Sequence, residues 1–322
     1  MKVLCSVGAT WVAVGLTVVL LADSPVTLGR RSKPGASDPA ANGTFRAETN
    51  LVLLSVSVTD PKKGPVTGLE KENFKVFENK VEQRVVHLSH QDEPIAVGLV
   101  FDTSGSMRKK IDKSRMAVAD FLKTTNPEDE FFLVEFDNQA HLAVPYTSNT
   151  RQIEYQLRAA SPHGRTALLD AIYLALQQLH RSSKPRKALI IVSDGGDNCS
   201  RYTKEEVRNL VYESDVLIYA MGVFSSLGVN RLSPEEAGGP DLLEDITTET
   251  GGHLYTVENI DKLPEAAQKI GIELRNYYVL AYVPATVHRD GKYHKVQVKV
   301  APPTGEHALR VAWRPGYYAP TE

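Results

Sequence analysis

The sequence predicts an α/β fold: a doubly wound, mainly parallel six-stranded sheet of the Rossmann-like kind, with one antiparallel edge strand and a small β domain beside it. Two observations predict the sheet. Between Pro94 and about Asn276, short apolar runs alternate with segments of helical periodicity, an order that produces right-handed strand–helix–strand crossovers. Three of these runs are almost continuously apolar, which is typical of parallel strands covered on both faces.

The elements of this central segment, 94–276, follow from their local patterns. The predicted strands are 95–101, 131–136, 188–193 and 216–223, and the predicted helices are 111–123, 166–180 and 203–214. In the second helix, Leu168, Ile172, Leu176 and Leu179 fall on one face. The strand 131–136 is followed by a turn over 137–140 and by an apolar stretch over 141–144. These two segments predict a hairpin, which supplies the antiparallel edge strand.

The segments 47–92 and 277–322, on either side, are predicted to be β structure. In the first, a strand over 51–58 precedes a hairpin in which 74–77 and 81–88 flank a turn. In the second, strands are predicted over 278–282, 293–300 and 308–313. Neither segment has enough strands to be stable alone. We therefore expect 47–92 and 277–322 to pack together as one β domain.

The amino-terminal segment 1–23 has the pattern of an export signal. Lys2 is followed by an uncharged, apolar stretch from Val3 to Ala22. The stretch is also long enough to be a membrane anchor, so an uncleaved amino-terminal anchor is the alternative. Residues 24–46 are rich in Ser, Pro, Gly and Ala and predict a flexible linker. We expect an exported protein, periplasmic or extracellular.

Composition excludes several classes of function. The formal net charge is −2 and 24% of the residues are charged, without a long basic run, so we expect no nucleic-acid partner. Contact with a membrane is expected only through an uncleaved amino-terminal segment. Cys5 and Cys199 are the two cysteines. Removal of the signal would leave Cys199 alone, so the protein is not a disulfide scaffold.

Oxygen-bearing side chains follow two of the predicted strands. Asp102 ends the first apolar run and is followed at alternate positions by Ser104 and Ser106, while Asp194 ends the run 188–193. Thr166 stands at the entry to a predicted helix. Sites in open α/β sheets form beyond the carboxyl ends of strands where the strand order reverses, so we expect these three loops to converge. Their carboxylates and hydroxyls are ligands that hard divalent cations prefer.

Each of these residues also has a plain structural interpretation. Ser104, Ser106 and Thr166 could satisfy free amides at helix starts, and Asp194 could belong to a simple turn. We expect a further acidic residue, Asp170, to be stabilised by its helix dipole. The remaining acidic residues nearby, Asp137 and Asp197, are interpreted as solvated loop charges. His87 and His90 lie three apart on a predicted strand and therefore on opposite faces, which argues against a zinc site there.

The combined pattern resembles the von Willebrand factor type A (VWFA) domain. The matching motifs are Asp102-x-Ser104-x-Ser106, Gly164–Ile172 and Ser193-Asp194-Gly195. The resemblance covers about 94–276, and all five positions of that family's metal-ion-dependent adhesion site are present. The flanks are similar to exported bacterial VWFA-related proteins of the acidobacterial type, at Val58–Asp60, Gly68–Phe74 and Pro315–Tyr318.

The resemblance implies a metal-dependent interaction module rather than an enzyme. Its metal ligands would be Asp102, Ser104, Ser106, Thr166 and Asp194, and Asp102 would act partly through bound water. The ion would be Mg²⁺ or Mn²⁺, with Ca²⁺ less suited. Because neutral hydroxyls leave the ion electrophilic, it could accept an Asp or Glu carboxylate from a partner protein, and no small-molecule substrate is expected.

Two other functions stay open at this stage. One is a structural scaffold whose metal only stabilises the fold. The other is a serine hydrolase that uses Ser104 on a strand-to-helix turn, although Asp102 stands where the nucleophile elbow needs a glycine. A further hypothesis concerns the residues 235–240, which we assign to a long loop. That loop would emerge beside the metal and could shape ligand choice.

Overall fold

The structure is a computed structural model that describes residues 51–60, 64–90, 93–184, 186–224, 238–257, 259–301 and 309–321. The predicted export signal 1–23, which includes Cys5, lies outside the described residues, as do the linker 24–46 and residues 235–237 of the predicted loop. None of the helices in the described ranges is both long and apolar enough to cross a membrane.

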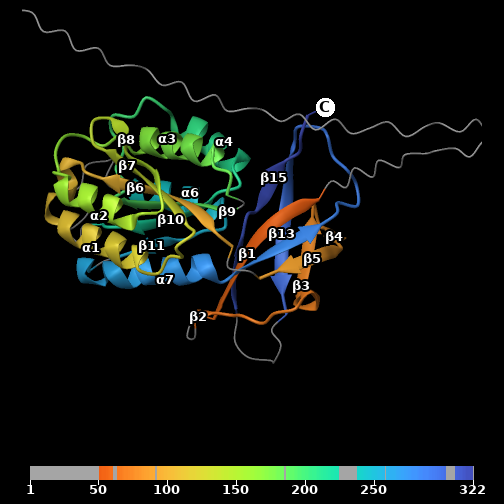
Figure 1. Ribbon diagram of the computed structural model, residues 1–322. Helices are drawn as coiled ribbons and strands as arrows, with labels where there is room; N and C mark the ends of the chain where they lie inside the picture. Colours follow the sequence, from red (N-terminus) through yellow and green to blue (C-terminus); the bar gives the residue numbers. More distant parts are fainter. Residues whose placement is uncertain are drawn as a thin grey trace, which may run out of the picture. The chain divides into compact units, whose positions relative to one another are not determined.

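The central sheet has six strands in the order β11-β10-β9-β6-β7-β8 (Figure 1). The strands are β6 (Ile95–Asp102), β7 (Glu130–Phe136), β8 (Ala140–Thr147), β9 (Arg186–Ser193), β10 (Leu217–Gly222) and β11 (Leu254–Thr256). All neighbouring pairs are parallel except β7 and β8, which form an antiparallel hairpin. β6 is buried along its whole length, as expected for a central strand covered on both faces.

Helices cover both faces of this sheet (Figure 1). Apolar residues of α1 (Ile111–Leu122), α2 (Thr150–Ala159) and α7 (Leu263–Arg275) pack in one core cluster, and those of α3 (Leu168–His180), α4 (Lys204–Glu213) and α6 (Gly239–Thr248) pack in another. The predicted α/β fold class is confirmed. The sequence patterns did not identify α2, α6, α7 or β11. Gly239 and Pro240 begin α6, so the end of the predicted 235–240 loop is helical.

The flanking segments form two antiparallel sheets. One contains β14-β1-β12-β5 with β2 paired to β1, and the other contains β15-β13-β3-β4. The strands are β1 (Val52–Asp60), β2 (Gly64–Pro65), β3 (Phe74–Glu78), β4 (Val81–Gln83), β5 (Val85–Ser89), β12 (Tyr277–Tyr282), β13 (Tyr293–Val300), β14 (Arg310–Trp313) and β15 (Gly316–Tyr318). Strands from the two flanks pair directly, as in β1 with β12 and β3 with β13, and they share one apolar core.

One flank element differs from its prediction. The sequence predicted a single strand over 81–88, but the chain leaves the strand conformation at Arg84. β4 pairs with β3 in one sheet, while β5 pairs with β12 in the other. The alternation of side chains does not reveal this break, because each half continues a β pattern. Arg84 is the residue at which the chain passes between the sheets.

A buried ion pair fastens α7 to the start of β6 in the central sheet. Asp129 is fully buried, and its carboxylate is paired with the guanidinium of Arg275 at the end of α7. Its Oδ1 also accepts the amide hydrogen of Ile95, at 3.0 Å, and its Oδ2 accepts that of Asn126, at 2.9 Å. Asp129 therefore joins α7 to the first residue of β6.

We expect Asp129→Ala to lower the free energy of unfolding by about 3 kcal/mol, because it removes a fully buried carboxylate that pairs with a guanidinium and accepts two amide hydrogens. Urea denaturation of the full chain measures this. The control is Asp112→Ala, since Asp112 pairs with Arg115 but its side chain is 85% exposed. Its loss should stay below about 1 kcal/mol. Equal losses in the two variants would contradict this role of Asp129.

Candidate functional site

The candidate site lies beyond the carboxyl end of β6, where the strand order reverses. β6 has β9 on one side and β7 on the other, both parallel to it. The chain runs from β6 to β7 and later returns to β9 on the opposite side. This makes the end of β6 a topological switch point, the usual place for a ligand site in an open α/β sheet. Asp102 is the last residue of β6.

Asp102 is fully buried and both of its carboxylate oxygens accept hydrogen bonds. Oδ1 accepts the amide hydrogen of Ser104 at 2.8 Å, and Oδ2 accepts the hydroxyl hydrogen of Ser193 at 2.6 Å. The Ser193 hydroxyl in turn accepts the amide hydrogen of Gly195 at 3.0 Å. The ends of β6 and β9 are therefore joined through one carboxylate.

The two serines after Asp102 place their hydroxyls together. Ser104 Oγ lies 3.1 Å from Ser106 Oγ, with Ser104 buried and Ser106 exposed. Ser104 is the N-cap residue of a short 3-10 helix, η2 (Gly105–Lys109), but its side chain makes no cap hydrogen bond. The capping interpretation is therefore wrong for Ser104. The Ser104 hydroxyl instead faces the Ser106 hydroxyl at the edge of the site.

Thr166 is buried in the loop before α3. Its amide donates to Asn198 Oδ1 at 2.9 Å, and its carbonyl accepts the amide hydrogen of Asn198 at 3.0 Å. The N-cap residue of α3 is Ala167, without a side-chain cap, so the N-cap interpretation of Thr166 is wrong. The amide and the carbonyl of Thr166 are both engaged by Asn198, so the side-chain hydroxyl is the group of this residue that could serve as a ligand.

Backbone hydrogen bonds hold the Thr166 loop against the Asp102 loop. The amide of His163 donates to the carbonyl of Thr103 at 2.8 Å, and the amide of Gly105 donates to the carbonyl of Gly164 at 3.2 Å. Gly164 has a φ of +72°, a left-handed conformation that costs glycine little. These bonds bring two of the three predicted loops side by side. The contact is between the loops, and Thr166 lies two residues beyond it.

Asp194 lies in the third of the three predicted loops, the one that follows β9. It is buried, and its Oδ2 accepts a hydrogen bond from the Lys110 ammonium at 3.0 Å. Within the described part of the chain, its other oxygen, Oδ1, is buried and has no hydrogen-bond partner. The next residue, Gly195, has a φ of +78° and packs against the backbone of Gly239, which begins α6. A plain turn does not account for an unpartnered buried carboxylate oxygen.

The carboxylate of Asp194 makes the buried Asp102 harder to ionise. The pKa of Asp102 is raised to about 7, first by burial and then by the negative charge of Asp194, while hydrogen bonds from Ser104 and Ser193 oppose the rise. Lys110 supplies one positive charge to the pair. The site therefore carries an excess of negative charge and an unsatisfied oxygen. A divalent cation would compensate both, so the donor set fits such an ion.

Sequence reasoning assigned no role in the site to three residues that build it: Ser193, which it noted only as part of a motif, Lys110 and Asn198. Ser193 is hidden because it ends an apolar run, and its role depends on β6 and β9 being neighbours. Lys110 sits in a segment of ordinary helix-forming residues. Asn198 follows Asp194 and holds the backbone of Thr166. Only the turn-forming composition of 194–198 signalled that this loop had a special conformation.

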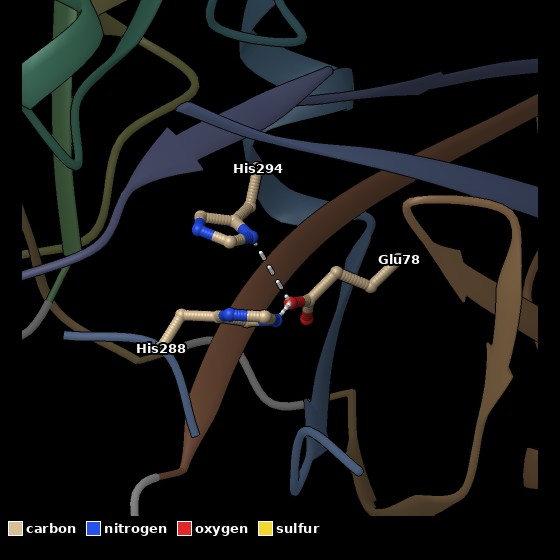
Figure 2. Close-up of side chains that lie close together, drawn as sticks. All are labelled: Glu78, His288 and His294. Atoms are coloured by element: carbon tan, nitrogen blue, oxygen red, sulfur yellow. Dashed lines mark ion pairs between the residues drawn. The ribbon is translucent and has the colours of Figure 1, made fainter. Parts of the chain in front are cut away.

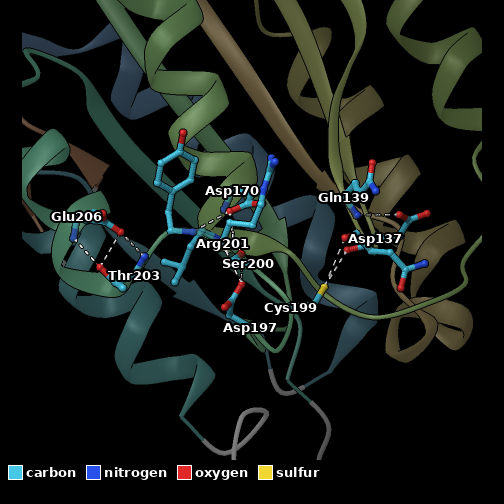
Figure 3. Close-up of polar contacts among 12 residues, drawn as sticks. Asp137, Gln139, Asp170, Asp197, Cys199, Ser200, Arg201, Thr203 and Glu206 are labelled. Carbon is cyan, nitrogen blue, oxygen red and sulfur yellow. Dashed lines mark hydrogen bonds and ion pairs between the residues drawn. The ribbon is translucent and has the colours of Figure 1, made fainter.

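The acidic residues around the site have structural roles (Figure 3). Asp197 is half-buried rather than solvated: it accepts the amide hydrogen of Leu169 at 3.2 Å and the hydroxyl hydrogen of Ser200 at 2.5 Å, and burial raises its pKa. Asp170 is also buried and its Oδ1 accepts the amide hydrogens of Arg201 and Tyr202, at 2.8 and 3.1 Å. These contacts fix the 197–202 loop on the start of α3.

The other residues considered from the sequence lie at the margin or elsewhere. Asp137 is half-buried and pairs with His163 Nε2 at 2.9 Å, so it is not a plain solvated charge. The half-buried Cys199 lies with its thiol 3.8 Å from the carbonyl oxygen of Asp137, to which it donates (Figure 3). His87 is exposed on β5.

Comparisons with known proteins agree with this architecture. A family model described as the von Willebrand factor type A domain matches residues 97–196. An uncharacterized protein of Borreliella burgdorferi is 25% identical over 198 residues, 55% of this chain and 57% of the relative. Mouse inter alpha-trypsin inhibitor heavy chain 4 is 30% identical over 129 residues, 36% of this chain and 14% of the relative. The chain thus spans less than two thirds of the length of these curated relatives.

A solved structure titled as von Willebrand factor type A from Catenulispora acidiphila aligns with a TM-score of 0.47 at 13% identity, over 76% of this chain and 73% of that chain. The open sheet, covered by helices on both faces, belongs to the Rossmann-like α/β class of domains. Carboxylates and hydroxyls lie at its switch point. The matched segment, 97–196, is less than half of the chain, and it resembles the von Willebrand factor type A domain. The family resemblance expected from the sequence is confirmed.

The raised pKa of Asp102 predicts a pH dependence in metal-free protein. Because the folded state holds this proton up to about pH 7 while the unfolded state releases it near pH 4, stability should fall as the pH rises between these values. The expected loss is a few kcal/mol, on the order of 1.4 kcal/mol for each unit of pKa difference.

Urea denaturation with a chelator, at pH 5 and at pH 8, measures this difference. The asparagine side chain of the Asp102→Asn variant cannot ionise. The free energy of unfolding of this variant should therefore change less between pH 5 and pH 8 than that of the parent chain. The same change in both proteins would show that the buried carboxyl group does not titrate as described.

Proposed function

We propose that the protein is an exported, metal-dependent protein-binding module. It holds Mg²⁺, or Mn²⁺, through Asp102, Ser104, Ser106, Thr166 and Asp194, and captures a carboxylate of a partner protein on that ion. The single observation that carries the proposal is the pair of buried carboxylates, Asp102 and Asp194, of which one oxygen has no hydrogen-bond partner among the residues that the structure describes. The match to the von Willebrand factor type A domain supports a role in protein interaction.

The five residues would contribute different groups to the binding of the ion. Ser104 and Ser106 would offer neutral hydroxyls from one loop, and Thr166 would offer another from the second. Asp194 would contribute its unpartnered oxygen. Asp102 has both oxygens engaged by Ser104 and Ser193, which favours contact with the ion through water. With only two carboxylates near it, the ion would keep enough positive charge to attract an acidic side chain.

The exposure of the ligands suggests where a partner would approach. Asp102, Ser104, Thr166 and Asp194 are buried, whereas Ser106 is exposed. The free coordination position is therefore expected on the Ser106 side. Arg108 and Lys109, both exposed, follow Ser106 in the same loop and would attract an acidic partner electrostatically.

The two alternatives are less well supported. A hydrolase would need a base beside Ser104, but the hydroxyl of Ser104 lies beside that of Ser106 and near the carboxylate of Asp102. Asp102 also occupies the position where a nucleophile elbow has glycine. A scaffold with a purely stabilising ion would not need an exposed ligand such as Ser106. That alternative is tested by partner capture rather than by metal binding alone.

We expect Asp102→Ala to abolish Mn²⁺ binding while the fold stays intact, because the change removes the charged centre of the ligand set. Isothermal titration calorimetry with Mn²⁺ measures this, and far-UV circular dichroism checks the fold. Asp112→Ala, on the exposed side of α1, is the control and should bind Mn²⁺ as the parent does. Unchanged Mn²⁺ binding by folded Asp102→Ala protein would exclude the proposed site.

Partner capture is tested with a peptide that presents a single Asp or Glu side chain, immobilised and offered to the protein with Mg²⁺ or with a chelator. A library of such peptides should yield captures that need the metal and disappear in Asp102→Ala. Metal binding without any such capture would favour the scaffold. Capture that survives the chelator would contradict a metal-bridged contact.

Lys110 is expected to compete with the ion. Its ammonium lies 3.0 Å from Asp194 Oδ2 and its side chain is 16% exposed, so it occupies one carboxylate that the ion would use. Lys110→Met should raise the affinity for Mn²⁺ about tenfold, corresponding to about 1.4 kcal/mol. Lys109→Met is the matched control, because the neighbouring Lys109 is exposed. A gain of equal size in both variants would mean that only net charge matters.

A further inference from the structure

A second group of metal-binding side chains lies in the β domain, in a part of the fold that the proposed function does not use. Figure 2 shows Glu78, His288 and His294 pointing toward one another. Glu78 ends β3, His294 lies on β13, and His288 comes from the segment that joins β12 to β13. One carboxylate oxygen and one nitrogen of each imidazole all lie within 4.8 Å of one another.

The spacing of these atoms is wrong for hydrogen bonds and close to that of metal ligands. Glu78 Oε1 lies 3.7 Å from His294 Nδ1 and 3.8 Å from His288 Nε2. Hydrogen bonds between such atoms are about 2.7–3.2 Å long. Around a tetrahedral Zn²⁺, with bonds of about 2.0–2.1 Å, ligand atoms are about 3.3 Å apart. Both distances exceed the ligand spacing by about 0.4–0.5 Å, so an ion would draw Glu78 closer to each imidazole.

The surroundings of His294 orient it for this role. Its second ring nitrogen, Nε2, lies 3.1 Å from Asp290 Oδ1, and a hydrogen on Nε2 would leave Nδ1 with a lone pair available to a metal ion. A carboxylate behind a histidine is the common arrangement for metal-bound imidazoles. The side-chain amide of Asn79 lies 2.9 Å from Nδ1. This amide, in the turn after β3, is the group that an ion would displace.

Glu78 is also held in place. Its Oε2 accepts the hydroxyl hydrogen of Tyr282 at 2.8 Å, and its Oε1 accepts that of Tyr317 at 3.3 Å. Glu78 and His294 are 3% and 4% exposed. A buried carboxylate is costly unless a positive charge compensates it. His288 is more accessible, with a side chain 29% exposed, and would leave an open side through which an ion and a water could enter.

The two imidazole rings are stacked, with centroids 4.0 Å apart. The segment that carries His288 is fixed near both of its ends: the amide of Ala285 donates to Gln83 Oε1 at 2.8 Å, and Asp290 forms a bridge with Thr321. The cluster is therefore formed by well-anchored backbone rather than by a chance approach of long surface side chains.

We propose that Glu78, His288 and His294 form a structural Zn²⁺ site, with water as the fourth ligand. Two imidazoles and one carboxylate form a ligand set that Zn²⁺ accepts readily. Glu78 belongs to the amino-terminal flank, and both histidines belong to the carboxy-terminal flank. The ion would fasten the two flanks of the chain to each other, next to the pairing of β3 with β13.

The test uses the full chain carrying Asp102→Ala, so that the site at the end of β6 does not contribute. Isothermal titration calorimetry should give one equivalent of Zn²⁺ bound, and a thermal melt followed by circular dichroism should show a higher melting temperature with Zn²⁺. Adding His288→Ala should reduce the Zn²⁺ affinity by at least about 100-fold, more than the loss typical of second-shell changes. His87→Ala, which removes an exposed histidine from β5 of the same domain, should leave the affinity unchanged.

A third variant separates metal binding from general stability. Asp290→Asn keeps all three ligands and should weaken Zn²⁺ binding about tenfold, because it weakens the support of His294. Circular dichroism without metal confirms that each variant folds. The proposal is overturned if the Asp102→Ala chain binds no Zn²⁺, or if the His288→Ala and His87→Ala variants bind it equally well. In either case the cluster would be a buried polar contact only.

Discussion

The arrangement of the site depends on one buried carboxylate at the end of a central strand. Asp102 joins the ends of β6 and β9 through Ser193 and shapes its own loop through the amide of Ser104. Burying this charge next to Asp194 is unfavourable in the protein alone, as the raised pKa of Asp102 indicates. Such a cost at a switch point is typical of a functional site rather than of a stabilising contact.

The rest of the fold keeps this carboxylate in place. β6 is covered on both faces, and each face has its own apolar core. Backbone hydrogen bonds then connect the Thr166 loop to the Asp102 loop, while Asp170 and Asp197 fix the loop beyond Asp194. The side chains of the site therefore have little freedom. A rigid set of oxygen ligands suits an ion with strict geometry, such as Mg²⁺.

The sequence predicts the parts of the molecule that have a strong local signal. The strands at 95–101 and 188–193 are almost continuously apolar, and polar residues of the site lie at or just beyond their ends. α7 was missed because Pro264 and Gly271 weaken its helical pattern. In the fold, Gly271 lets α7 approach α1 closely, since a Cβ there would lie 2.2 Å from Thr124 Oγ1.

Residues that act through contacts distant in sequence carry no local signal. Lys110 and Ser193 matter only because β6 and β9 are neighbours. Glu78 meets His288 and His294 only after the two flanks have paired. The break at Arg84, where one predicted strand becomes two strands in different sheets, is likewise decided by packing. Tertiary structure determines these features, and the hydrophobic pattern does not record them.

The most direct measurement is an anomalous difference map from crystals of the full chain soaked in Mn²⁺. The account predicts a peak between the hydroxyls of Ser104 and Ser106 and the free oxygen of Asp194, with Thr166 as a further ligand and Lys110 moved away from Asp194. A map without a peak there at saturating Mn²⁺, or with Thr166 turned away from the ion, would contradict the account.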